Sequence, residues 1–91
     1  MKFDITVDGG HKAEVNIELD QQGTFSGSVI STEYGTGQIT NGRPVGAALV
    51  GNVSLGGYNA DFSAQIAGSN ISGRLKYGWF FDKSFAGAQI V

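Results

Sequence analysis

Apolar and polar residues alternate with a period of two along nearly the whole chain. This alternation is typical of half-buried β-strands, and glycines interrupt the stretches that could otherwise show the three-four spacing of a helix. The sequence therefore predicts an all-β protein. Its strands are expected within 3–7, 12–19, 24–31, 34–41, 47–55, 58–67, 70–76 and 79–90.

Turn residues separate these strands. The pairs Gly9-Gly10 and Gly56-Gly57 each stand between two alternating runs, as in tight hairpins. The segment 42–46 contains the only proline, Pro44. Because proline has no N–H to donate to a ladder, a loop between two halves of the chain is predicted there.

The two halves can be laid over each other, which predicts an internal repeat of one four-stranded unit over 4–42 and 52–87. Each half contains a hairpin, a Ser-Gly strand, a Tyr-Gly corner and a closing strand, in that order. Chance similarity among glycine-rich hairpins is the alternative. Duplication also explains why Gly27 and Gly73 lie inside strands: each is expected at an equivalent crowded point, where a strand coils sharply or an aromatic ring covers it.

Strand edges favour a closed structure. An open sheet of eight strands would leave unpaired edges, with little Lys or Pro to protect them. The last strand is therefore expected to pair with the first, so that residues 1–91 form a single domain, an eight-stranded antiparallel up-and-down barrel. The side chains expected to point inward are Phe3, Ile5, Val15, Ile17, Phe25, Val29, Ile39, Leu49, Val53, Phe62, Ile66, Leu75 and Phe85.

This meander resembles the calycin-like barrels, the group of lipocalins, fatty-acid-binding proteins and avidins. The resemblance is carried by the repeated strand x-Phe/Ile-Ser-Gly-x-Val/Leu, by the Tyr-Gly that follows it, and by the ending near Phe85-Ala86-Gly87. It implies the barrel fold. The lipocalin Gly-x-Trp opening is missing near the N-terminus, because the only tryptophan is Trp79. No ligand residue of these families is therefore carried over.

Composition narrows the functional classes. The net charge is −2 and the six basic residues are scattered. Nucleic acid is not an expected partner, because binding its backbone needs clustered Lys and Arg. The lack of cysteine excludes disulfides, thiolate catalysis and cysteine-ligated zinc. Charges interrupt the apolar residues near the N-terminus, so no signal peptide and no membrane span are expected, and the predicted location is cytoplasmic.

The polar residues do not form a recognisable catalytic set. His11 is the only histidine and is expected to be an exposed hairpin residue, without the partners that a triad or a metal site needs. Glu14 and Asp61 occupy matching positions in the two repeat units, on the second and the sixth expected strand, and both should point outward. They are therefore expected to be solvated surface charges rather than a pair that performs acid-base chemistry. A non-enzymatic protein without cofactor or metal is therefore predicted.

Aromatic residues supply the leading functional hypothesis. Rings beside small inward residues predict a pocket for a small apolar or aromatic molecule. The predicted ligand-binding residues are Tyr34, Tyr58, Tyr77 and Trp79. The alternative is a solid barrel whose rings fill the interior, as is common in small barrels.

Self-association is a second functional hypothesis. Ile30, Ala48 and Val50 fall on the phase opposite to the core, and the consecutive rings of Trp79, Phe80 and Phe81 cannot all face inward. Exposed apolar patches on small proteins often mark partner surfaces. The sequence therefore also allows a structural or interaction protein, a homodimer that pairs through Val50 and Trp79-Phe80.

Overall fold

The computed structural model describes residues 1–31, 35–55, 57–78 and 81–90, with the backbone alone at positions 55, 58 and 81. Over these residues the chain forms strands joined by turns. The strands are β1 (Lys2–Val7), β2 (His11–Leu19), β3 (Phe25–Ser31), β4 (Gly35–Val45), β5 (Ala48–Leu55), β6 (Tyr58–Ala67), β7 (Asn70–Tyr77) and β8 (Phe81–Gln89).

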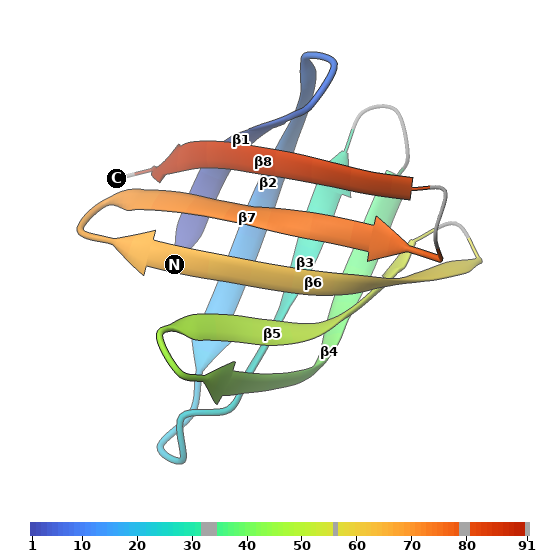
Figure 1. The fold of residues 1–91 in the computed structure, drawn as a ribbon. Helices are drawn as coiled ribbons and strands as arrows, with labels where there is room; N and C mark the ends of the chain where they lie inside the picture. The colour runs from blue at the N-terminus through green and yellow to red at the C-terminus, as the bar shows by residue number, and fades with distance from the viewer. Residues whose placement is uncertain (32–34, 56, 79–80, 91) are drawn as a thin grey trace.

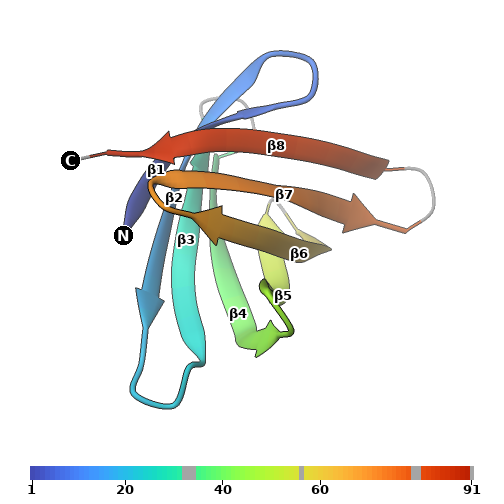
Figure 2. The same ribbon diagram turned by 60° about the vertical axis from the view of Figure 1, so that its left-hand side comes forward.

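The strands pair in chain order, and β8 closes on β1 to give a barrel (Figure 1). The closing register runs from Phe3 opposite Gln89 to Val7 opposite Phe85, and the N–H of Ile90 adds a 2.8 Å bond to the carbonyl of Lys2. Strands β1–β4 form one wall, and β5–β8 cross it at a steep angle (Figures 1 and 2). The predicted all-β, eight-stranded antiparallel barrel is confirmed.

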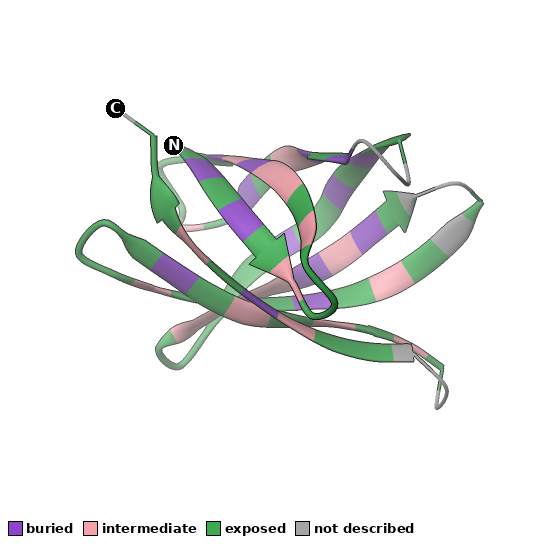
Figure 3. Ribbon diagram, turned by 90° about the horizontal axis from the view of Figure 1, so that it is seen from above, coloured by how far each residue is buried: buried purple, intermediate pink, exposed green. Residues whose placement is uncertain are grey.

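The inner faces of both walls meet in one core (Figure 3). Each of its members is at most 5% exposed, and they are Phe3, Ile5, Val15, Ile17, Phe25, Val29, Ile39, Val53, Phe62, Ala64, Ile71 and Phe85. Three residues expected inside, Leu49, Ile66 and Leu75, are partly buried and pack against this core. Ile71 was missing from the expected set, although it shares a face of β7 with Leu75.

Pro44 corrects the predicted loop at the middle of the chain. It lies within β4, opposite Leu49 of β5, and the turn falls at residues 46 and 47. The pairing of β3 with β4 ends where Phe25 faces Gly42. Beyond that point β4 has a neighbour on one side only, and proline is tolerated where a strand has such a free edge.

Irregular pairing bends β4 from one wall toward the other. The register of β4 with β5 shifts between Thr40 and Arg43, and Asn41 has a φ of 57°. A bulge of this kind leaves one residue unpaired and turns its strand. Figure 1 shows the end of β4 bending toward the direction of β5.

Glycines inside strands allow backbones to approach closely. A Cβ on Gly27 would lie 1.9 Å from the carbonyl oxygen of Asn16. A Cβ on Gly73 would lie 2.1 Å from the carbonyl oxygen of Ser63 and 2.6 Å from the ring of Phe85. Both distances are impossible for a real side chain. The expected crowding at these two glycines is therefore confirmed.

Strand registers can be compared between the predicted repeat units. Ile17 of β2 faces Gly27, and Ala64 of β6 faces Gly73. Val15 likewise faces Val29, as Phe62 faces Leu75. Equivalent positions thus meet equivalent partners, whereas a duplication at 4–42 and 52–87 stays a prediction about origin.

Replacing Gly27 by Ala should lower the free energy of unfolding by about 3 kcal/mol, because the added methyl forces two backbones apart. Gly51 provides a matched control, since a Cβ there would lie 2.9 Å from the carbonyl oxygen of Thr40 and needs a smaller shift. Urea unfolding of both variants should give a much lower midpoint for Gly27→Ala than for Gly51→Ala. Similar midpoints would contradict the crowding argument.

Candidate functional site

One end of the barrel collects the residues that point to ligand binding. Strands β1, β3, β5 and β7 end there, and β2, β4, β6 and β8 begin there, because the strands run alternately up and down. The inward-facing residues at the described strand ends are Val7, His11, Ser31 and Tyr77, and we call this end the tyrosine mouth. The two termini lie at the opposite end (Figure 2).

Two of the four predicted ligand residues, Tyr58 and Tyr77, lie on strands at this end. Tyr77 is the last residue of β7, follows Leu75 on the inner face and is half-buried. Tyr58 begins β6 opposite Leu55, and its side chain lies outside the described part of the structure. Tyr34 and Trp79 lie outside the described residues altogether. Their binding role therefore stays a prediction.

The glycines of both Tyr-Gly pairs adopt the conformation of tight turns. Gly35 has a φ of 84° and Gly78 a φ of 61°, values that side chains with a Cβ rarely allow. Gly78 therefore turns the chain immediately after Tyr77, so that the tyrosine occupies the last position of its strand at the mouth. The Tyr-Gly pair at 77 and 78 therefore marks a corner of the chain, as predicted.

His11 and Ser31 join the mouth although sequence reasoning gave neither a role there. His11 is half-buried opposite Val7, which corrects the expectation of an exposed hairpin residue. Its Nε2 lies only 3.1 Å from the place where a Cβ of Gly9 would stand. Ser31 is 9% exposed, on the face of β3 that also holds Val29. Strict alternation from Val15 and Val29 would have placed both inward.

Phenylalanine rings form the floor below the mouth. The rings of Phe62 and Phe85 are stacked, with centroids 5.8 Å apart and planes 16° apart. Phe25 meets Phe62 at 6.3 Å with a tilt of 59°. Offset stacked and tilted rings are the arrangements that aromatic side chains prefer. A ligand at the tyrosine mouth would therefore rest above a ring-filled centre.

Hydrogen bonds tie the strand ends together beside the mouth. The N–H of Asp8 donates to the carbonyl of Ser84 at 2.9 Å, and the N–H of Ser84 donates to Asp8 Oδ2 at 3.2 Å. This reciprocal pair extends the closure between β1 and β8 beyond Val7. The rim is thereby fixed on the side where the barrel closes.

Four of the charged residues form exposed surface pairs. Glu14 lies 3.7 Å from Lys2, and Arg74 lies 2.9 Å from Asp82. Asp61 accepts a hydrogen bond from Asn52 at 3.2 Å on the outer surface. Within the ranges that the structure describes, no three His, Asp or Glu residues are placed to hold a metal ion. Those ranges also contain no helix of the length and apolarity that a membrane crossing requires.

Asp20, in the turn at the opposite end, has a lowered pKa. The side-chain hydrogen bond with Thr24 lowers the pKa of Asp20 most, and the N–H groups of Gln22 and Thr24, at 2.8 and 3.1 Å from Oδ1, lower it further. These bonds favour the ionised form. The carboxylate therefore closes the turn between β2 and β3.

A closed meander of eight strands around a phenylalanine core defines a barrel of calycin-like architecture. The same fold occurs in a solved structure. This is a mutant of the fluorescent protein UnaG, which matches with a TM-score of 0.62 and 10% identity over 99% of this chain and 94% of that chain. The likeness confirms the predicted resemblance at the level of the fold. No protein-family model matches the chain, and no curated protein sequence matches it.

The pKa of Asp20 should be found below the 3.8 of an unperturbed aspartate in an NMR titration of its carboxyl carbon. A depressed pKa stabilises the fold above the unfolded value, and this contribution is lost as the pH falls through the folded value. Thr24→Val should move the pKa back toward 3.8, because the largest cause of the shift is removed. An unchanged pKa in this variant would disprove the assignment.

Proposed function

We propose that this protein is a non-enzymatic barrel that binds a small apolar or aromatic molecule at the tyrosine mouth. The observation that carries the proposal is the half-buried Tyr77, at the same end of the barrel as the half-buried His11 and the buried Ser31, with stacked phenylalanine rings in the core below. Small-molecule sites combine an apolar lining with a few polar groups that fix orientation. The described rim offers this mixture.

The position of the floor determines how the ligand would lie. Because Phe62 and Phe85 occupy the centre, the molecule would sit across the mouth rather than deep inside the barrel. Tyr34, Tyr58 and Trp79 would complete the lining around Tyr77. A flat ring system would gain most, since ring contacts contribute about 0.5–1.5 kcal/mol beyond the area they bury.

The structural likeness guides the choice of ligand class. UnaG is called a fluorescent protein, and fluorescent molecules contain conjugated groups. Conjugated ring compounds are therefore the first candidate ligands to test for this barrel. On β8, such a compound would approach the ring of Phe85, which also covers Gly73.

The competing homodimer receives less support from the described surface. Val50 is half-buried, and its neighbours across the ladder are Arg43 on β4 and Ser63 on β6, so polar residues flank it. Trp79 and Phe80 lie outside the described residues. Association through Val50 and Trp79-Phe80 stays a prediction.

Tyr77→Ala should weaken binding of the neutral ring compound N-phenyl-1-naphthylamine by about tenfold, the factor that corresponds to about 1.4 kcal/mol of lost ring contact. Tyr77→Phe should bind almost as the parent protein, because the ring remains. A fluorescence titration at fixed protein concentration gives the affinities.

Leu19→Ala provides the control for this titration. Leu19 is exposed and lies at the opposite end of the barrel, so its truncation should leave the affinity unchanged. Equal weakening by Leu19→Ala and Tyr77→Ala, or an absence of saturable binding to the parent protein, would count against a site at the tyrosine mouth.

A further inference from the structure

The outer surface of β2–β6 carries two rows of polar side chains that no part of the proposed mouth uses. In the first row each residue faces the next across a strand pair, and the series is Asn16, Ser28, Gln38, Ser54 and Asn59. All five are neutral and can form hydrogen bonds. All point away from the core, because their chain neighbours Ile17, Val29 and Ile39 point into it.

The second row lies one pleat further along the strands. Its members are Glu18, Ser26, Thr40, Asn52 and Asp61. The register shift of β4 lies beside Thr40, and there Asn41 Nδ2 donates to Asn52 Oδ1 at 3.1 Å. Asn52 Nδ2 in turn donates to Asp61 Oδ1 at 3.2 Å. This chain of amides fixes the orientation of the groups at the β4–β6 end of the row.

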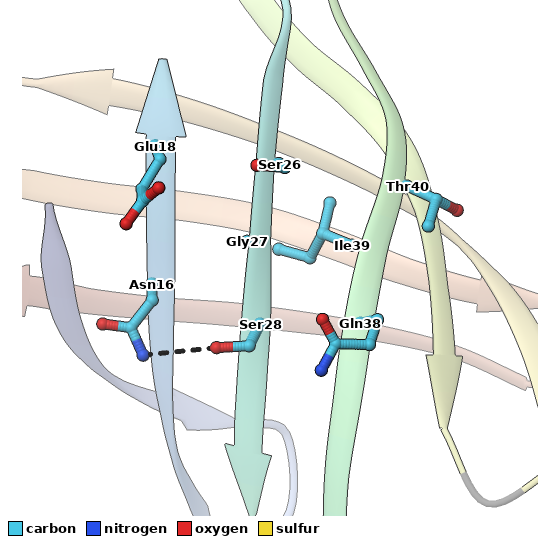
Figure 4. A pocket seen from close by; sticks show the side chains of 8 residues that line it. All are labelled: Asn16, Glu18, Ser26, Gly27, Ser28, Gln38, Ile39 and Thr40. Atoms are coloured by element: carbon cyan, nitrogen blue, oxygen red, sulfur yellow. Dashed lines mark hydrogen bonds between the residues drawn. The ribbon is translucent and has the colours of Figure 1, made fainter. Parts of the chain in front are cut away.

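A hollow opens between the two rows on β2, β3 and β4 (Figure 4). Its volume is about 490 Å³, within the range of about 300–1,000 Å³ found for small-molecule sites. Gly27 of β3 belongs to its lining, between the outward-pointing Ser26 and Ser28. The surrounding polar side chains are those of Asn16, Glu18, Ser26, Ser28, Gln38 and Thr40.

Most polar side chains around the hollow have no hydrogen-bond partner within the described residues. Asn16 Nδ2 donates to Ser28 Oγ at 3.4 Å, a long bond. Within the described parts of the chain, the side chains of Glu18, Gln38 and Thr40 have no hydrogen bond or ion pair to another residue. No Lys or Arg belongs to either row, so nothing there would neutralise an anionic ligand.

We propose that this outer face binds a neutral oligosaccharide, with one sugar unit in the hollow and the following units crossing the strands toward Asn52 and Asp61. Amide and carboxylate side chains each offer two polar atoms, which suits pairs of neighbouring sugar hydroxyls. Adjacent strands lie about 4.8 Å apart, a spacing comparable with the length of one hexopyranose unit. Glu18 would accept hydroxyl protons in the hollow.

The test is an NMR titration of the full chain, labelled with ¹⁵N, against cellotetraose and maltotetraose. Saturable shifts of the side-chain amides of Asn16 and Gln38, with a dissociation constant on the order of 1 mM for at least one tetraose, would support the proposal. Weak affinity is expected because the surrounding polar side chains form hydrogen bonds but include no ring for stacking. Shifts centred on Ser31 and Tyr77, or no saturable shift up to the solubility limit, would overturn it.

Two variants and a matched control separate binding from folding. Gln38→Ala should weaken binding about fivefold and Glu18→Ala about tenfold, through lost neutral and charged hydrogen bonds respectively. Gln65→Ala removes another exposed outward amide, on β6 and away from the hollow, and should leave the affinity unchanged. If Gln65→Ala weakens binding as much as Gln38→Ala, or if neither hollow variant weakens it, the site is not the proposed one. Tyr77→Ala should not affect saccharide binding, so this proposal is independent of the tyrosine mouth.

Discussion

Pairing between the first and last strands is the contact on which the rest of the structure depends. Gly87 of β8 faces Ile5 of β1, and a Cβ at Gly87 would lie 1.8 Å from the carbonyl oxygen of Asp4. The two backbones thus approach more closely than any residue with a side chain permits. Closure removes the free edges of the sheet and turns one face of every strand toward a shared interior.

A closed barrel of this size has room for few large side chains, which explains the division between core and mouth. Phe62 lies between Phe25 and Phe85, so three rings occupy the middle. Inward-facing residues at the strand ends lie further from these rings, and Tyr77 among them is half-buried. The tyrosine mouth therefore follows from the limited length of the strands rather than from a separate structural device.

Alternation alone predicted the strands, their order and most of the core, because a period of two assigns each side chain to a face. It could not place Pro44, since the tolerance of a proline depends on where the neighbouring strand β3 ends. His11 was misplaced because the adjacent glycine pair suggested a hairpin tip, although alternation from Val15 points it inward. The outer hollow was not predicted, because it depends on registers between strands and on the shift near Thr40, which a single sequence does not reveal.

The two proposed surfaces use opposite faces of the same strands, and this has a physical consequence. β2 presents Ala13, Val15 and Ile17 to the interior and Asn16 and Glu18 to the outer hollow. Because side chains on opposite faces do not touch, substitutions outside should act nearly additively with those inside. Exposed ion pairs lie on β1–β2 and β7–β8, where they support solubility and leave the polar rows on β2–β6 largely neutral. One small barrel could therefore bind one ligand at the tyrosine mouth and another on its polar outer face, with neither site changing the affinity of the other.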